Sequence, residues 1–419
     1  MDHEQLAALR RDLHRHPEPA WCEYRTTSRI VEEVERIGVD ELRVGPELLD
    51  GDTRMAVPDG ETLGQWRERA REAGAREDVL DQCAGGFTGA LATVDGGDGP
   101  TVALRVDIDA LPITEADDRT HAPARAGFRS GTEGYMHACG HDAHAAIGIG
   151  VLEAVVESDF AGTFKLLFQP AEEVIGGGRA VAESGVLDDV DHLLALHIGL
   201  DHPTGEVVAG VNGFLAVRQF EANFRGESAH AGGHPAAGRD AVQALATAVQ
   251  NLHAIRRHED GATRVNAGVV SGGTASNIVP ESATLEGEVR GETTELMEYM
   301  SDRAESVVTH AAGMHGCESE VATLAEAPSA ESDAALADVV YAVAEGVEGV
   351  DSVVHSAPLG GSEDATYLME RVQERGGRAS FVGVGTDHPG GHHTPTFDVD
   401  ERSLAIGVDV LAGAIEQLG

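Results

Sequence analysis

Between residues 88 and 199, short apolar runs alternate with segments of helical pattern. The runs are TGALATV, TVALRVDID, TFKLLFQP and HLLALHIG, and helical patterns separate the later ones. Apolar strands that are joined through helices are typical of a mainly parallel sheet covered on both faces. We therefore expect an α/β fold in which helices flank a mainly parallel sheet.

Side chains of the kinds that bind metals follow several of these runs. Asp107 and Asp109 end the second run, Glu172 and Glu173 follow the third, and His197 ends the fourth. In open α/β sheets, chemistry gathers beyond the carboxyl ends of the strands. Adjacent residues in extended backbone point apart, so one carboxylate of the acidic pair can bind a metal while the other reaches a bound water.

A thiol and three imidazoles lie within the eight residues of HACGHDAH, positions 137–144. Thiolate and imidazole together favour a borderline-soft divalent ion. The alternative is a Cys139–His pair that acts as nucleophile and base, which would leave the residues at the strand ends without a shared purpose. A second histidine group lies in DHPGGHHTPTFD, where spacing does not choose among His388, His392 and His393.

Charge limits the classes of partner. The chain has 72 acidic and 30 basic residues, a formal net charge of -42 and a single lysine, Lys165. Nucleic-acid binding is not expected, because phosphate contacts need a basic face. Salt screens the repulsion among so many acids, so we interpret the charge as adaptation to a salt-rich cytoplasm; the alternative is a merely acidic protein.

No apolar run reaches the roughly 18 to 20 residues that cross a bilayer, so no membrane partner is expected. The N-terminal segment lacks the apolar stretch of a signal peptide. We therefore expect a cytoplasmic protein.

A second domain is indicated between residues 213 and 324, where the pattern runs strand, helix, strand, strand, helix, strand. This βαββαβ order is typical of a ferredoxin-like unit. We expect residues 213–324 to form an inserted ferredoxin-like lid or dimerisation domain, and residues 1–212 and 325–419 to form the catalytic domain. A polar excursion over residues 45–85 has no function that its pattern indicates.

The motifs together resemble the aminoacylase-like di-metal amidohydrolases, a family that includes hippurate, indole-acetyl-amino-acid and p-aminobenzoyl-glutamate hydrolases. The resemblance covers nearly the whole chain, through RRDLHRHPE, RVDIDALP, MHACGHDAH, FQPAEE, LHIG, SGGTASNIVP and HHTPTFDVDE. The excursion with RMAVPD and the segment GGSEDATYLMERVQERGGRASFVGVGT are most similar to the A-type subunit of p-aminobenzoyl-glutamate hydrolases. The resemblance implies a metal-dependent amidohydrolase with a di-zinc peptidase-like catalytic domain.

The resemblance also implies a ligand set for two divalent ions, zinc or manganese. In it, Cys139 bridges both ions, His141 and His197 complete one site, and Glu173 and His393 complete the other. His393 is chosen because the family places its last ligand just before a small residue and a proline, as in His-Thr-Pro here.

Further roles follow from the same resemblance. Glu172 is the expected general base, and Asp109 is expected to orient the cluster. In the inserted domain, His230 and Asn277 are similar to residues that reach the scissile carbonyl, within one subunit or from a neighbouring one. Arg290 is similar to the clamp for the substrate carboxylate. The segment ESAHAGGHP departs from the family, whose members more usually have paired glycines before the histidine.

The implied reaction is hydrolysis of the amide bond of small, carboxylate-bearing N-acyl or aminobenzoyl amino acids by a metal-activated water. We expect a homodimer, or assembly with a related second chain. Two other classes remain open, a catalytically silent metal-binding or regulatory paralogue and a cysteine-nucleophile hydrolase. A metal amidohydrolase predicts turnover that a chelator abolishes. A silent paralogue predicts metal binding without turnover, and a cysteine-nucleophile hydrolase predicts turnover that alkylation abolishes and that needs no metal.

Overall fold

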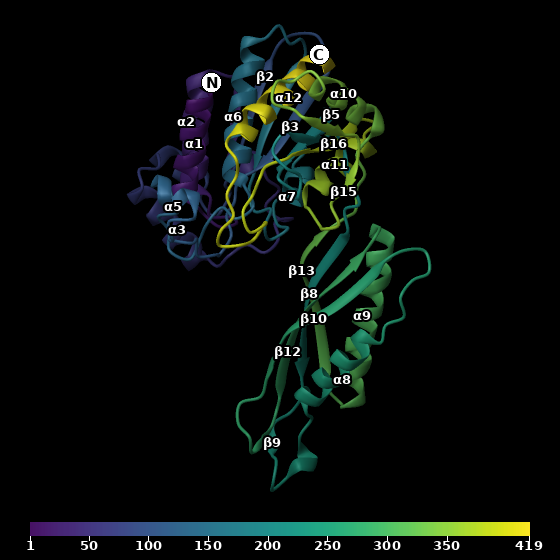
Figure 1. The fold of residues 1–419 in the computed structure, drawn as a ribbon. Coiled ribbons are helices and arrows are strands. Elements are labelled where there is room, and N and C mark those ends of the chain that lie inside the picture. The colour runs from purple at the N-terminus through teal and green to yellow at the C-terminus, as the bar shows by residue number, and fades with distance from the viewer. The chain divides into compact units, whose positions relative to one another are not determined.

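The computed structural model describes residues 1–419, and the chain divides into two compact units (Figure 1). The first unit comprises Met1–Gly213, Ala330–Leu359 and Asp364–Gly419, and the second comprises Phe214–Ser329 and Gly360–Glu363. The second unit thus ends later than the expected residue 324 and takes in a short return segment. Its role as a lid or in dimerisation stays a prediction.

A mixed sheet of eight strands forms the centre of the first unit. In chain order, its strands are β1 (Glu41–Val44), β2 (Ala90–Asp95), β3 (Thr101–Asp107), β4 (Thr163–Gln169), β5 (His192–Ile198), β6 (Glu206–Val208), β14 (Ser352–Val354) and β16 (Arg378–Val384). They lie in the order β1-β2-β4-β3-β5-β16-β6-β14. The middle strands β4, β3, β5 and β16 pair in parallel, whereas β1, β2 and β4 pair antiparallel. The expected mainly parallel sheet is confirmed.

Helices flank this sheet, so its middle strands are buried along nearly their whole length (Figure 1). The helices of the unit are α1 (His3–Arg15), α2 (Tyr24–Ile37), α3 (Gly60–Glu72), α4 (Glu77–Gln82), α5 (Ala122–Ala126), α6 (His141–Glu157), α7 (Gly178–Glu183), α10 (Ala334–Ala344), α11 (Ala365–Glu374) and α12 (Arg402–Leu418). α6 packs on β3, β4 and β5 and also contacts α1, α2 and α12. α11 packs on β5 and β16 and contacts α7. A 3-10 turn, η1 (Gly45–Glu47), and a parallel pair, β7 (Val211–Asn212) with β15 (Ala357–Pro358), complete the unit.

The excursion over residues 45–85 lies against this unit. α3 packs on α2, and the Trp66 ring meets the Tyr135 ring edge-on with centroids 5.0 Å apart. The carbonyl oxygen of Met55 accepts a 2.8 Å hydrogen bond from Nε1 of Trp21. These contacts pack the excursion into the first unit.

The second unit has the predicted βαββαβ order. Its main elements are β8 (Ala216–Arg225), α8 (Ala241–His253), β10 (Thr263–Gly272), β12 (Ser282–Gly291), α9 (Thr294–Met314) and β13 (Glu318–Ala327), with the small pieces β9 (Ala229–His230), η2 (Pro235–Ala237) and β11 (Ile278–Val279) between them. The four long strands form an antiparallel sheet in the order β10-β12-β8-β13. Phe220, Phe224, Leu285 and Met300 are among the residues that form its core.

None of the helices combines the length and the apolar character that crossing a membrane would require.

A buried ion network joins α1 to two distant segments. Arg10 is fully buried, and its guanidinium donates to Asp142 at 2.7 Å and to Asp398 at 2.6 Å. Burial alone would lower the pKa of Arg10, but the carboxylates of Asp142 and Asp398 raise it above its usual value. Asp142 also lies 2.9 Å from Nδ1 of His14. The network therefore fixes α1 against the start of α6 and the segment before α12.

We expect Arg10→Met to destabilise the first unit strongly, because Asp142 and Asp398 would remain buried without their counter-charge. Removing one partner of a buried ion pair typically costs about 3–5 kcal/mol of unfolding free energy. Urea unfolding followed by tryptophan fluorescence reports on this unit, since both tryptophans, Trp21 and Trp66, belong to it.

Arg11→Met is the matched control. The Arg11 side chain is 43% exposed and pairs with Glu401, so its loss should cost below about 1 kcal/mol. Equal destabilisation by the two variants would contradict a special role for the buried network.

Candidate metal centre

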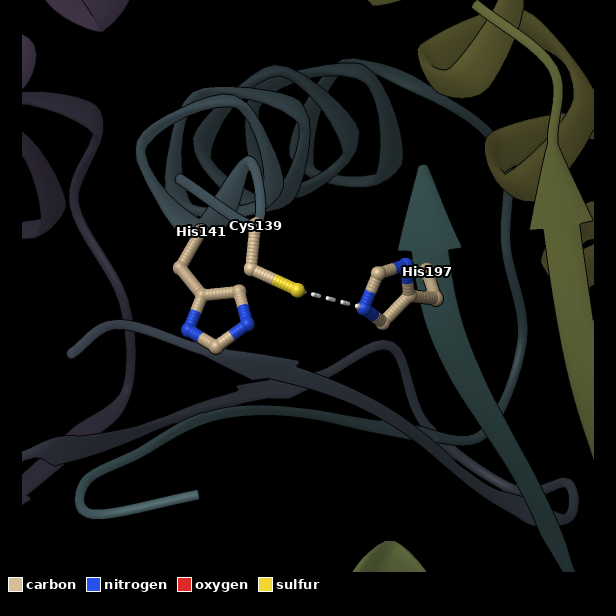
Figure 2. A group of neighbouring side chains, drawn as sticks. All are labelled: Cys139, His141 and His197. Atoms are coloured by element: carbon tan, nitrogen blue, oxygen red, sulfur yellow. Dashed lines mark hydrogen bonds between the residues drawn. The ribbon is translucent and has the colours of Figure 1, made fainter. Parts of the chain in front are cut away.

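The segment that carries Cys139 and His141 turns sharply at Gly140. Gly140 has a φ of 91°, a left-handed conformation that glycine adopts without steric cost. A Cβ at this position would also lie 2.5 Å from Cγ2 of Ile198 at the end of β5. The turn brings Cys139 and the first residue of α6, His141, beside His197 at the end of β5 (Figure 2).

Cys139 faces His197. The sulfur lies 3.4 Å from Nε2 of His197 (Figure 2), and Nδ1 of the same ring lies 2.8 Å from the carbonyl oxygen of Ile198. A carbonyl oxygen only accepts, so Nδ1 carries the ring proton and the lone pair of Nε2 points toward the sulfur. Burial, with His144 next to it, holds the pKa of His197 well below its ordinary value. A neutral imidazole oriented in this way suits a metal ligand.

His141 has carboxylates around it and no hydrogen bond to either ring nitrogen. Both nitrogens are buried without a partner, and they lie 3.4 Å from Asp109 and 3.6 Å from Asp107. Burial lowers the pKa of His141, but these carboxylates more than offset that effect and raise it well above its ordinary value. The position therefore attracts positive charge, which a divalent ion can supply in place of a proton.

Asp109 fixes the acidic pair. Its two carboxylate oxygens accept hydrogen bonds from the backbone N–H groups of Glu172 and Glu173, each at 3.0 Å. The side chains of the pair then reach Nε2 of His141 at 3.9 Å and 3.8 Å respectively. This arrangement fixes the backbone of the acidic pair and places Glu172 beside the donor cluster; the orienting role of Asp109 stays a prediction.

The rings of His392 and His393, both in the histidine-rich loop, have different neighbours. Nε2 of His393 lies 3.5 Å from Glu173, and the backbone N–H of His393 donates to the carbonyl oxygen of Ala138 at 2.8 Å. His392 instead accepts from the backbone N–H of Leu200 through Nε2 at 3.1 Å, which leaves its Nδ1 3.5 Å from the Cys139 sulfur. The loop thus places His393 beside Glu173 and gives His392 the position of a donor to sulfur; the choice of His393 as the ligand stays a prediction.

Five groups of donor atoms could each hold an ion, and two of the five include Cys139. These two are Cys139, His141 and His197, and Cys139, Glu173 and His393; within each, the ligand atoms lie within 4.8 Å of one another. Thiolate, imidazole and carboxylate donors match a borderline divalent ion. The residues therefore fit a two-ion centre in which one sulfur serves both ions.

The same surroundings do not suit a cysteine nucleophile. Burial and the carboxylate of Glu173 raise the pKa of the Cys139 thiol well above its ordinary value. A reactive cysteine needs a lowered pKa, because the thiolate is the nucleophile.

Three buried residues behind the cluster were given no role from the sequence. Arg105 donates to Asp107 at 2.8 Å, and the other oxygen of Asp107 lies 2.5 Å from Nδ1 of His144. Nε2 of His144 accepts from the backbone N–H of Ile198 at 2.8 Å. These contacts support the end of β5 next to His197. An arginine inside the apolar run TVALRVD was the available signal.

The three expected substrate-binding residues all lie in the second unit. Nδ1 of His230 accepts from the backbone N–H groups of Gly232 at 3.1 Å and Gly233 at 2.9 Å. The ring proton of neutral His230 must therefore sit on Nε2, on an exposed side chain. The Asn277 side chain is exposed as well, and its backbone carbonyl oxygen accepts from the backbone N–H of Ala231 at 3.0 Å.

Arg290 has a carboxylate partner that the sequence analysis missed. Its guanidinium donates to both oxygens of Glu288 at 3.0 Å and to the Ser362 hydroxyl at 3.3 Å. Residues two apart on a strand share a face, so the spacing in GEVRG could have indicated this pair. The clamp role of Arg290 stays a prediction.

Cys139→Ala should lower the metal content per chain, because the sulfur is common to both donor groups. Elemental analysis after dialysis into metal-free buffer measures the change. Cys317→Ala is the matched control, since Cys317 is also a buried cysteine but lies in the second unit. Unchanged metal content in Cys139→Ala would contradict the two-ion assignment.

Comparisons with known proteins identify the family of the chain. Residues 103–417 match the family described as peptidase family M20/M25/M40. An indole-3-acetyl-aspartic acid hydrolase from Enterobacter agglomerans is 45% identical over 97% of this chain and 94% of its own length. The A-type subunit of the p-aminobenzoyl-glutamate hydrolase from Escherichia coli is 43% identical over the same shares, 97% and 94%.

Solved structures show the same similarity. An aminobenzoyl-glutamate utilization protein from Klebsiella pneumoniae matches with a TM-score of 0.84 and 40% identity, over 98% of this chain and 96% of the other. A dinuclear metal-binding peptidase of the M20 family from Bacillus subtilis matches with a TM-score of 0.72 and 27% identity, over 99% and 98%. The chain therefore belongs to peptidase family M20/M25/M40 and is a metal-dependent amidohydrolase.

Proposed function

We propose that this amidohydrolase cleaves the amide bond between an acyl or aminobenzoyl group and an acidic amino acid. The observation that carries the proposal is the donor cluster around Cys139, with Glu172 beside it. The choice of amino acid is supported by the two relatives above, whose names specify a glutamate and an aspartate conjugate.

We propose zinc or manganese as the two divalent ions. Thiolate and imidazole donors suit zinc, and the carboxylate of Glu173 also suits manganese. When bound, such ions polarise the amide carbonyl and make water a nucleophile near neutral pH. Cys139, His141, His197, Glu173 and His393 would hold them.

Glu172 is the proton carrier in this proposal. Its backbone is fixed through Asp109, and its carboxylate lies at the edge of the cluster, 3.9 Å from Nε2 of His141. The carboxylate accepts a proton from the attacking water and delivers it to the leaving nitrogen, so one group serves as base and then as acid.

Binding of an acidic substrate needs a local cation, because the chain has a net charge of -42. We propose that Arg290 supplies it. Each of its two Nη atoms carries two N–H groups. One N–H group of Nη1 donates to Ser362 and one of Nη2 donates to Glu288, so each Nη atom keeps a second N–H group for a substrate carboxylate. His230 and Asn277 would donate to the scissile carbonyl. The Nε2 proton of His230 supports that role, because a developing oxyanion needs an N–H donor.

A substrate panel tests the function. The panel contains p-aminobenzoyl-glutamate, indole-3-acetyl-aspartate, hippurate and neutral N-acetyl amino acids, each assayed with added zinc or manganese. We expect the highest kcat/KM for the conjugates of acidic amino acids. Faster turnover of hippurate or of neutral substrates would overturn the choice of amino acid, and metal binding without any turnover would favour a silent paralogue.

Glu172→Ala is the companion variant in the same assay. It should keep both ions and lose about 10²- to 10⁴-fold in kcat, the usual contribution of a general acid–base. Glu183→Gln, an exposed acid at the end of α7, is the control that should change neither quantity. Near-normal kcat in Glu172→Ala would contradict the proposed mechanism.

We propose that the protein works in a salt-rich cytoplasm. The support is the net charge of -42, since a Debye length of about 3 Å at 1 M salt screens the repulsion between like charges. The same substrate panel tests this proposal when it is run in dilute and in molar KCl. We expect a higher rate of hydrolysis in molar KCl. A higher rate in dilute buffer would contradict this setting.

We propose further that the second unit pairs with another copy of the chain. Strand β10 is an edge of its sheet and exposes Val269 and Val270, each 54% exposed. An exposed apolar edge strand is a template for pairing with another chain. One relative is named as the A-type subunit of its hydrolase, so a related second chain is the other occupant to test.

Val270→Lys should convert a dimer into a monomer, because it places a charge on the β10 edge. Light scattering after size exclusion in molar KCl measures the mass. Leu324→Lys, on the opposite edge strand β13, should leave the mass unchanged. A wild-type monomer would favour a separate second subunit, and dissociation by Leu324→Lys alone would contradict pairing through β10.

A further inference from the structure

The residue before the proposed base has an unusual backbone. Ala171 has a φ of 59°, in the left-handed region that a residue with a Cβ adopts only at a cost. It directly follows Pro170 at the end of β4 and is fully buried. The direction in which Glu172 leaves the strand depends on this one torsion.

Three buried carboxyl groups accept the backbone N–H groups of the turn that begins here. Glu23 accepts from Ala171 at 2.8 Å, and Asp109 accepts from the next two residues. Asp364 accepts from Gly177 at 3.1 Å and Gly178 at 2.7 Å. Of the three, only Glu23 accepts from Ala171; Ile175, later in the same turn, also has a positive φ, of 53°, and its N–H donates to the carbonyl oxygen of Glu172 at 2.7 Å.

Glu23 is itself firmly seated. It is fully buried immediately before α2, and its other carboxyl oxygen accepts from the Thr88 hydroxyl at 2.5 Å. The Thr27 hydroxyl donates to the carbonyl oxygen of Glu23 at 2.6 Å. The start of α2 therefore serves as a fixed support for a turn that lies 148 positions later in the chain.

We propose that Glu23 is a positioning residue that holds Ala171 in its left-handed conformation and thereby directs Glu172 at the metal centre. This inference rests on the proposed role of Glu172 as the base. Without the Glu23 acceptor, the N–H of Ala171 is buried with no partner, and the turn relaxes toward an ordinary negative φ. The backbone at Glu172 then turns and weakens its own N–H contact to Asp109, so the Glu172 carboxylate leaves its place, while Asp109 still accepts from the N–H of Glu173.

The expected signature is a loss of kcat without a loss of metal. Glu23→Ala should lower kcat about 10- to 100-fold, as is usual when a supporting partner of a site is removed, with KM and metal content within about twofold of the wild type. Glu23→Gln keeps an oxygen for Ala171 and an amide group for Thr88, so it should stay within about threefold in kcat. Equal losses in both variants would overturn the proposal, because the hydrogen bond would then not be what matters.

A second substitution tests the torsion directly. Glycine adopts a positive φ without support, so Ala171→Gly should restore part of the kcat that Glu23→Ala loses. This double-mutant cycle measures the coupling between the two positions. Additive effects would overturn the proposal.

Glu18→Ala is the matched structural control. Glu18 is also a buried carboxyl near the start of α2 that accepts two backbone N–H groups, those of Arg25 and Thr26. It should lower the melting temperature and leave kcat unchanged. A kcat loss in Glu18→Ala as large as that in Glu23→Ala would assign both effects to stability and overturn the positioning role. Full kcat in Glu23→Ala beside an inactive Glu172→Ala would overturn the positioning role alone, whereas an active Glu172→Ala overturns the proposed function itself.

Discussion

Hydrogen bonds from backbone N–H groups to buried carboxyl oxygens are the interaction on which the catalytic unit depends. Each strand of a parallel sheet is followed by a loop. The backbone groups of the loop need new hydrogen-bond partners, because the bonds between neighbouring strands end there. Here Asp109 accepts from the segment after β4, and Asp364 accepts from the start of α7. Carboxylates make stronger bonds to N–H groups than neutral acceptors do, so the loops that carry the ligands are held as firmly as the strands.

This use of acid gives the unit its electrostatic character. Asp107 and Asp109 lie around His141, so the centre selects positive charge, although it is embedded in a chain that is already strongly acidic. Inside the unit, Arg105 and Arg10 compensate part of the buried negative charge. The cations of this protein are few, and two of them are fully buried where they brace the site.

The sequence predicted the parts of the fold that a local pattern encodes. Buried apolar runs predicted β3, β4 and β5. Strands β6 and β14 escaped prediction because each has only three residues, too few to show an alternating pattern. In the site, the residue types indicated a metal cluster, but the separate positions of His392 and His393 depend on a backbone path that spacing does not encode. The pairing of Arg290 with Glu288 was missed, although their spacing of two residues on one strand could have indicated it.

The buried contact between Arg10 and Asp398 joins residues 388 positions apart. During synthesis, the first helix must therefore wait for almost the whole chain before its arginine can pair with both Asp142 and Asp398. The ligand set has the same requirement, since its members extend from residue 139 to residue 393. A chain that ends before residue 393 carries the first donor group, Cys139, His141 and His197, but lacks part of the second. The complete donor set for two ions is therefore available only when nearly the whole chain has been made.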